Sequence, residues 1–171
     1  MRYKPKRQKR DNWCLPACLQ EVIRLRRFME LSQREIASEL DVNARGADID
    51  LERLDDFLSR YDLKCFHYNP FMDVSMSPDI FLETELNFKQ DVMAAYDFLK
   101  LHKRGRTSKE INARHFSIIE RYNTRRDLID LVDPSSKHGV RVKQAESFHL
   151  PDLVDAMQAR EDMRYGFYVV F

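Results

Sequence analysis

Apolar residues recur at helical spacing along the first part of the chain. In the segment 14–28 they occupy positions 18, 19, 22 and 25, which fall on one face of a helix. Pro16 fits that helix only in its first turn, where no intrahelical N–H is lost. Ser32 and Glu35 have the spacing of a capping box, so the sequence predicts a second, short helix over 33–40.

Two further helices and one strand are predicted downstream. A third helix, capped by Asp48, is indicated by apolar residues on one face: Leu51, Leu54, Phe57 and Leu58. Alternating residues over 63–68 predict a strand. The segment 69–87, with two prolines and many short polar residues, gives no clear pattern. A fourth helix, over 88–102, is indicated by four residues that share one face: Val92, Met93, Tyr96 and Leu99.

The second half of the chain has the pattern of a sheet. The expected elements are a strand at 115–122, a hairpin turn at 123–126, a return strand at 128–133, a strand at 139–143, a helix at 151–160 and a closing strand at 165–171. Helices come first and hairpin-connected strands later. This order favours an α+β fold with an antiparallel sheet, in a single domain over 1–171.

Composition and charge exclude several classes of protein. Charged residues make up 33% and hydrophobic residues 43% of the 171 residues, as in globular proteins, and the net charge of +1 gives no overall basic field for nucleic acid. No apolar run approaches the roughly 18 residues that span a membrane. With no secretory signal and only three cysteines, we expect free thiols in a cytoplasmic protein. The basic run 2–10 belongs to an N-terminal arm, 1–12, that we expect to be irregular and solvated.

Cys14 is the candidate nucleophile. It lies at the predicted start of the first helix, where unpaired backbone N–H groups and the helix dipole favour an anion. That position lowers the pKa of a thiol and makes a thiolate available near neutral pH. Cys18, one helical turn later among apolar residues, is expected to be a core residue.

A cysteine nucleophile needs a base and a group that orients the base. His115 begins one strand of the predicted hairpin and Asp133 ends the other, so the two residues are neighbours in the sheet. Asp133 can then accept the imidazole N–H, although Asp130 competes for this role. Gln8 can donate its side-chain amide to a developing oxyanion, alongside the backbone N–H of Cys14.

These residues together carry a resemblance to a known family. Gln8, the run Cys14-Leu-Pro-Ala-Cys-Leu, His115-Phe-Ser-Ile-Ile-Glu and Leu-Val-Asp133-Pro resemble, in order and spacing, the papain-like cysteine peptidases. The branch they resemble most is the bacteriocin-leader-processing peptidases associated with export transporters, here as a stand-alone domain. The motifs cover about 8–22 and 115–134.

The resemblance implies a papain-like fold whose helical half carries the cysteine and whose sheet half carries the histidine. It implies Cys14 as nucleophile, His115 as base and acid, Asp133 as orienting group and Gln8 in the oxyanion hole. It also implies a peptide or protein substrate and no metal or organic cofactor. The family has glycine directly after the nucleophile, whereas this chain has Leu15, so we expect a narrowed approach to the thiol.

Other interpretations of the same residues stay open at this point. The fold can carry a catalytically silent binding module, or an acyl transferase or deamidase that uses the same residues. A metal pair formed by Cys14 and Cys18 with Cys65 or a histidine is a minor alternative. Nucleic-acid binding through the run 2–10 is a third, less favoured class. The remaining histidines lack matching partners and are taken as surface or structural residues: His67, His102, His138 and His149.

Overall fold

The computed structural model describes residues 2–42, 50–102, 114–135, 145–158 and 165–171. Its helices are α1 (Cys14–Arg27), α2 (Gln33–Glu39), α3 (Leu51–Ser59), α4 (Pro78–Asn87), α5 (Phe98–Leu101) and α6 (Leu150–Met157). Its strands are β1 (Cys65–Tyr68), β2 (Asp91–Asp97), β3 (Arg114–Asn123), β4 (Leu128–Val132), β5 (Glu146–His149) and β6 (Gly166–Val170). The architecture is α+β with an antiparallel sheet, which confirms the predicted fold class.

The first three helices form as the sequence predicts. Helix α1 begins at Cys14, and the Ser32 hydroxyl with the Glu35 carboxylate closes the capping box of α2 in both directions. Helix α3 is capped by Asp50, whose carboxylate accepts the backbone N–H of Glu52 at 3.0 Å. The predicted cap was Asp48, which lies outside the described residues.

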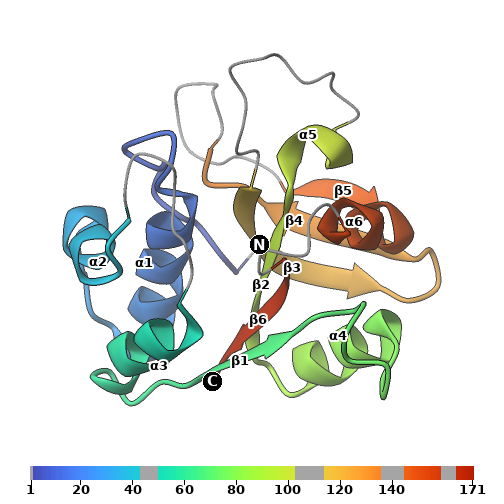
Figure 1. Ribbon diagram of the computed structural model, residues 1–171, viewed down its shortest axis with the longest axis horizontal. Coiled ribbons are helices and arrows are strands. Elements are labelled where there is room, and N and C mark those ends of the chain that lie inside the picture. The colour runs from blue at the N-terminus through green and yellow to red at the C-terminus, as the bar shows by residue number, and fades with distance from the viewer. Residues whose placement is uncertain (1, 43–49, 103–113, 136–144, 159–164) are drawn as a thin grey trace.

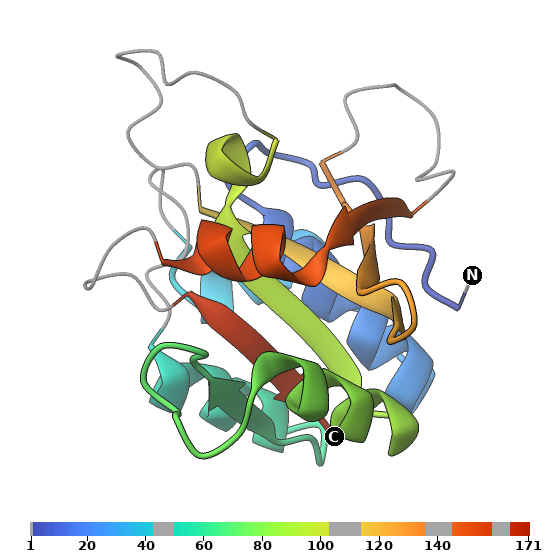
Figure 2. The same cartoon turned by 90° about the vertical axis from the view of Figure 1, so that its right-hand side faces the viewer.

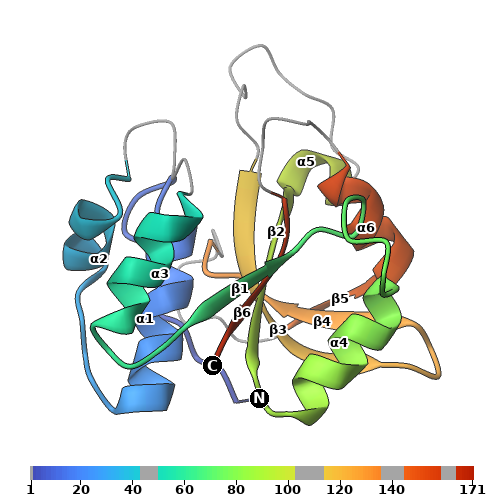
Figure 3. The same cartoon turned by 60° about the horizontal axis from the view of Figure 1, so that its bottom comes forward.

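The strands form one antiparallel sheet in the order β1-β6-β2-β3-β4-β5. Figures 1 and 3 show α1, α2 and α3 on one face of this sheet and α4 and α6 on the other. Each face buries its own apolar cluster, because side chains along a strand alternate between the two faces. The hairpin of β3 and β4 was predicted with nearly the observed bounds, and its register pairs Ile118 with Val132.

The predicted helix over 88–102 is wrong. The structure has strand β2 there, followed by the single turn α5. Every residue of β2 is buried, because the strand lies between β6 and β3 with helices on both faces. A strand buried on both faces is apolar throughout and shows no alternation, and the run Val-Met-Ala-Ala-Tyr therefore also matched a helical template.

The sequence predicted the remaining segments with mixed success. The unreadable stretch 69–87 contains α4, which starts with Pro78 in its first turn. Strand β5 was not predicted, whereas α6 and β6 lie where the sequence placed them. The strand expected at 139–143 lies outside the described residues. None of the described helices combines the length and the apolar character needed to span a membrane.

The N-terminal arm is irregular, as expected, but it is not a solvated tail. Tyr3 is only 2% exposed, and its hydroxyl donates a hydrogen bond to Asp91 at the start of β2. The carboxylate of Glu120 on β3 accepts the backbone N–H of Arg2 and, at 3.0 Å, that of Tyr3. Figure 2 shows the arm running from the N-terminus to the start of α1. The arm therefore joins the sheet to the helical half.

Candidate active site

Cys14 occupies the first position of α1 and is 7% exposed. No side chain caps this end of the helix, so its N–H groups remain directed at the start of α1. Burial alone would raise the pKa of the Cys14 thiol. The hydrogen bond and positive charge of His115 outweigh that effect, aided by hydrogen bonds to the backbone of Phe116 and Leu15, and hold the pKa below its usual 9.0. The contact with His115 thus makes the Cys14 thiol easier to deprotonate than a buried cysteine without such a partner.

His115 and Asp133 meet at the open end of the β3–β4 hairpin, as the topology predicted. The Nε2 atom of His115 lies 2.6 Å from the Oδ1 atom of Asp133, although the residues are 18 positions apart. Burial favours the neutral imidazole, but the hydrogen bonds with Asp133 and Cys14 raise the pKa of His115 to about 10. The imidazole of His115 therefore lies between the Asp133 carboxylate and the Cys14 thiol, and both partners favour its charged form.

The two ring nitrogens of His115 have different partners. Nε2 is held by Asp133, so the hydrogen bond to the Cys14 sulfur falls to Nδ1. The imidazole thus connects the start of α1 with the end of β4. A proton on Nδ1 is placed to move to or from groups bonded at the sulfur. The predicted contact between a sulfur from the helical half and an imidazole about a hundred residues later is present.

Asp133 is oriented by a residue that the sequence analysis missed. Ser135 donates its backbone N–H to Oδ1 at 2.6 Å and its hydroxyl to Oδ2 at 2.8 Å. Burial would raise the pKa of Asp133, but the hydrogen bond and charge of His115 and the two bonds from Ser135 hold it below its usual 3.8. An aspartate that binds the backbone two residues on is an Asx turn, and the Asp-Pro-Ser sequence was the available signal.

Asp130, the competing candidate, is engaged elsewhere. Its Oδ2 accepts a hydrogen bond from Nε of Arg121 at 2.9 Å, and its Oδ1 accepts the hydroxyl of Ser147. These partners lie on the neighbouring strands β3 and β5, away from the imidazole. Of the two aspartates, Asp133 is therefore the one that contacts the His115 imidazole.

Two aromatic rings fix the plane of the His115 imidazole. Tyr96 lies edge-on to it with ring centroids 5.8 Å apart, and Phe98 does so at 5.2 Å. The Tyr96 hydroxyl shares a buried hydrogen bond of 2.8 Å with Ser117. Sequence reasoning placed both aromatic residues on a helix, so it had no means of finding them beside the histidine.

Gln8 lies next to this group through its backbone. Its N–H donates to the carbonyl of Pro134 at 3.0 Å, directly after Asp133. Its side-chain Nε2 donates to the carbonyl of Asp11 at 3.0 Å, whereas its buried Oε1 has no partner among the described residues. One amide proton of Gln8 is thus used within the arm, which the sequence analysis did not foresee.

The residues that follow Cys14 pack inward. Leu15 is 2% exposed and belongs to the core cluster shared by α1 and the sheet, so the expectation that it narrows the approach to the thiol is wrong. Cys18 is fully buried, as predicted, and burial raises its pKa further above the usual 9.0. Among the described residues, no three His, Cys, Asp or Glu side chains gather as a metal site, so the alternative metal pair finds no third ligand there.

Two of the histidines set aside by the sequence analysis, His67 and His102, have structural partners. The Nε2 of His67 lies 3.1 Å from the carbonyl oxygen of Tyr165. His102 stacks against Phe98, with ring centroids 4.1 Å apart. His149 is exposed before α6, and His138 lies outside the described residues. No second histidine of the described chain thus competes for the place beside Cys14.

Comparison with solved structures identifies the fold. No protein-family model and no curated protein matches this sequence. The peptidase domain of Streptococcus ComA, a bi-functional ABC transporter of a quorum sensing pathway, superposes with a TM-score of 0.62 at 12% identity over 99% of this chain and 96% of that one. A double glycine motif protease from an AMS/PCAT transporter, solved with a leader peptide, gives 0.56 at 12% over 98% and 90%. The chain has a papain-like peptidase fold.

In the papain-like fold, the helical half that carries Cys14 packs against the sheet half that carries His115. Its neighbours belong to the transporter-associated branch that the motifs over 8–22 and 115–134 resemble, so that likeness is confirmed at the level of the fold. The superpositions span nearly the full length of both neighbours.

Proposed function

We propose that this chain is a cysteine peptidase whose catalytic residues are Cys14, His115, Asp133 and Gln8. The observation that supports it most directly is the imidazole of His115, which is bonded to the thiol on one nitrogen and to the carboxylate on the other. A thiol activated by an adjacent base, with that base oriented by a third group, is the arrangement of a nucleophilic enzyme. The peptidase fold of the neighbours agrees with this role.

The proposed reaction begins with the Cys14 thiolate, which attacks the carbonyl carbon of the scissile bond. The oxyanion that forms accepts hydrogen bonds from the backbone N–H of Cys14 and the side-chain amide of Gln8. His115 then gives its Nδ1 proton to the leaving amine, and a thioester remains on Cys14. Water, deprotonated by the now neutral His115, attacks the thioester and releases the acid. Asp133 stabilises the imidazolium and fixes its orientation throughout.

Gln8 has the donor capacity that this role requires. Its Nε2 carries two protons, and the carbonyl of Asp11 accepts one of them. The second proton is left for the oxyanion, while the bond to Asp11 limits rotation of the amide. A donor held in place before the reaction loses little freedom when the charge develops.

The proposed substrate is a peptide or protein, in keeping with the leader peptide bound to one structural neighbour. The thioester can also pass to another amine, or form from a glutamine side chain, with the same four residues. Analysis of the products by mass spectrometry separates the three outcomes, because hydrolysis, transfer and deamidation change the substrate mass differently.

The test is labelling with a thiol-reactive vinyl amide at neutral pH. The modified residue is located by peptide mapping. We expect labelling of Cys14 and not of Cys65, even though Cys65 is the more exposed, because burial raises the pKa of Cys65 to about 12. Cys65→Ser is the matched control and should label like the wild type.

The variant His115→Ala decides between an enzyme and a silent module. Without the imidazolium, burial dominates the Cys14 thiol and its pKa rises, so labelling should fall by at least tenfold. Labelling of Cys14 that is indifferent to His115 would support a catalytically silent binding module on the same fold.

A further inference from the structure

The N-terminal arm carries a row of cations whose backbone is fixed. The side chain of Gln33, which is 1% exposed, forms hydrogen bonds with the backbone of the arm. Its Oε1 accepts the N–H of Lys9 at 2.8 Å, and its Nε2 donates to the carbonyl of Arg7 at 3.1 Å. The carboxylate of Glu21 accepts the N–H of Lys4 at 2.6 Å. Because Tyr3 and Pro5 are buried, the basic side chains between and after them point outward.

We call the exposed side chains of Lys4, Lys6, Arg7, Lys9 and Arg10 the cationic strip. Lys6 has one exposed acidic neighbour, Glu30, at 3.4 Å, and such a pair contributes little. Arg10 lies over the ring of Trp13, 4.8 Å from its centroid. Within the described part of the chain, the side chains of Lys4, Arg7 and Lys9 form no ion pair.

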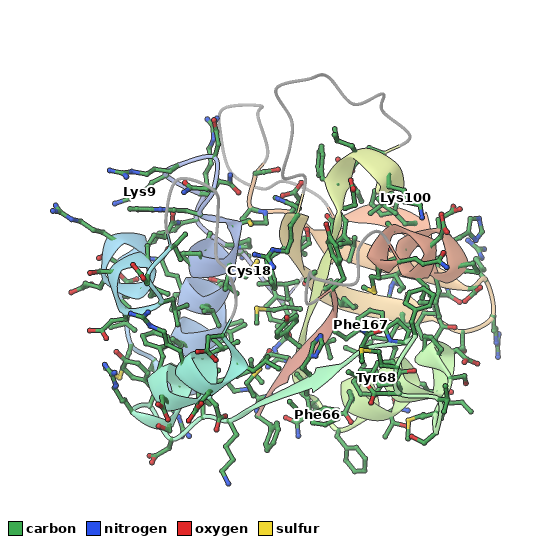
Figure 4. All side chains as sticks on the ribbon, viewed as in Figure 1. Lys9, Cys18, Phe66, Tyr68, Lys100 and Phe167 are labelled. Carbon is green, nitrogen blue, oxygen red and sulfur yellow. The ribbon has the colours of Figure 1, made fainter. Side chains whose placement is uncertain are left out.

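The strip is a local concentration of charge. The whole chain carries only +1, so its other surfaces balance these cations with acidic groups. Figure 4 shows Lys9 at the outside of the helical half, above α2. A fixed row of like charges raises the local concentration of an anionic ligand and steers its approach.

The strip also ends at the candidate active site. The residue between Arg7 and Lys9 is Gln8, whose N–H is bonded to the carbonyl of Pro134 beside Asp133. Arg10 stacks on Trp13, the residue directly before Cys14. A peptide bound at Cys14 that continues along the arm therefore passes the strip.

We propose that the cationic strip is a docking surface for an acidic segment of the peptide substrate, next to the bond that Cys14 attacks. This inference rests on the proposed function, and it names the substrate class of that site. Glutamate and aspartate side chains on the substrate pair with Lys4, Arg7 and Lys9, and this pairing acts before the chemical step. Nucleic acid fits the strip less well, because the aromatic residues of the arm, Tyr3 and Trp13, are buried and offer no stacking platform.

The experiment measures kcat and KM on two peptides that differ only in a Glu-rich or Gln-rich segment beside the scissile bond. We expect the wild type to prefer the acidic peptide through KM, with kcat unchanged, because the strip binds substrate and transition state alike. In Arg7→Gln/Lys9→Gln the preference should fall by up to about fivefold per charge. The substitutions leave the bonds from Gln33 intact, because these involve only the backbone of the arm.

The matched control is Arg125→Gln/Arg126→Gln, which removes the same charge from the exposed β3–β4 turn. It should keep the preference of the wild type. The preference should also weaken with added salt, since exposed charges are screened. An equal loss of preference in both double variants, or no preference at all in the wild type, overturns the inference.

Binding to Cys14→Ala separates this inference from the proposed function. Labelled oligoglutamate should bind this inactive variant, and binding should weaken when Arg7→Gln/Lys9→Gln is added. If oligoglutamate binds but Cys14 of the wild-type chain does not react with the vinyl amide, the proposed function fails and the strip remains. If Cys14 reacts but oligoglutamate does not bind, the strip fails alone. A single-stranded oligonucleotide that binds more tightly than oligoglutamate assigns the strip to nucleic acid instead and overturns the proposal.

Discussion

Gln33→Ala tests whether the arm positions Gln8 for catalysis. Gln33 makes two good hydrogen bonds to the arm, with the N–H of Lys9 at 2.8 Å and the carbonyl of Arg7 at 3.1 Å, and a third with the Oε1 of Gln20 at 3.2 Å. Each such bond contributes about 0.5–1.5 kcal/mol, and truncation also leaves buried Gln20 without this partner. We expect the free energy of unfolding to fall by about 2–4 kcal/mol.

The effect on catalysis has a different signature. Loss of one oxyanion donor costs about a hundredfold to a thousandfold, so Gln8→Ala should slow acylation of Cys14 by that factor. Gln33→Ala only loosens the segment that carries Gln8, and a displacement near 1 Å costs up to about a hundredfold. The rate is measured as the burst of nitrophenol released from nitrophenyl acetate, which needs no knowledge of the natural substrate.

The double variant Gln8→Ala/Gln33→Ala decides the question. If Gln33 acts through Gln8, the double variant acylates no more slowly than Gln8→Ala alone, while its stability falls as in Gln33→Ala. Gln90→Ala is the matched control, since its side chain accepts a hydrogen bond from Arg26 and makes none with residues 6–9. It should leave the burst unchanged. Rate losses of Gln8→Ala and Gln33→Ala that multiply in the double variant would refute the reasoning.

Three further outcomes follow from the site. Alkylation of Cys14 by iodoacetamide should reach half its maximal rate below pH 9.0 in the wild type and above pH 9.0 in His115→Ala, because His115 lowers the pKa of the thiol. Equal pH profiles of the two proteins would contradict the proposed Cys14–His115 pair. Asp133→Asn removes the charge that raises the pKa of His115, so the alkaline limit of activity should move to lower pH. Tyr3→Phe deletes a buried hydrogen bond to Asp91, and urea unfolding should show a loss of about 1.5–3 kcal/mol; an unchanged midpoint means that the arm is not anchored there.

The pairing of His115 with Asp133 could be predicted because it depends on local geometry alone. A hairpin brings the start of one strand beside the end of the next, and the turn signal at 123–126 fixed which residues these are. The position of Cys14 followed in the same way from the pattern of α1 and the restriction on Pro16. Both inferences needed only neighbours in sequence or in one hairpin.

The aromatic residues around His115 could not be predicted from the sequence, because they depend on which strands lie at the centre of the sheet. Tyr96 and Phe98 contact the imidazole only because β2 pairs with β3 and places Tyr96 opposite His115. A strand covered on both faces loses the alternation that identifies strands, so the pattern of 88–102 matched a helix. The assignment used only the local spacing of apolar residues, whereas the burial of β2 on both faces is a property of the tertiary structure.

The spacing of six residues between Gln8 and Cys14 does not by itself place the Gln8 amide where it could act as an oxyanion donor. Six positions along an irregular chain fix no direction for the amide of Gln8. Its place comes from the carbonyl of Pro134 in the sheet half, from Gln33 in the helical half and from the carbonyl of Asp11 within the arm. If Gln8 is the donor, as we propose, a change in how the two halves pack moves the donor as well as the thiol–imidazole pair. We therefore expect that Gln33, which does not lie beside Cys14 in sequence, influences the rate through the position of Gln8 and without touching the substrate.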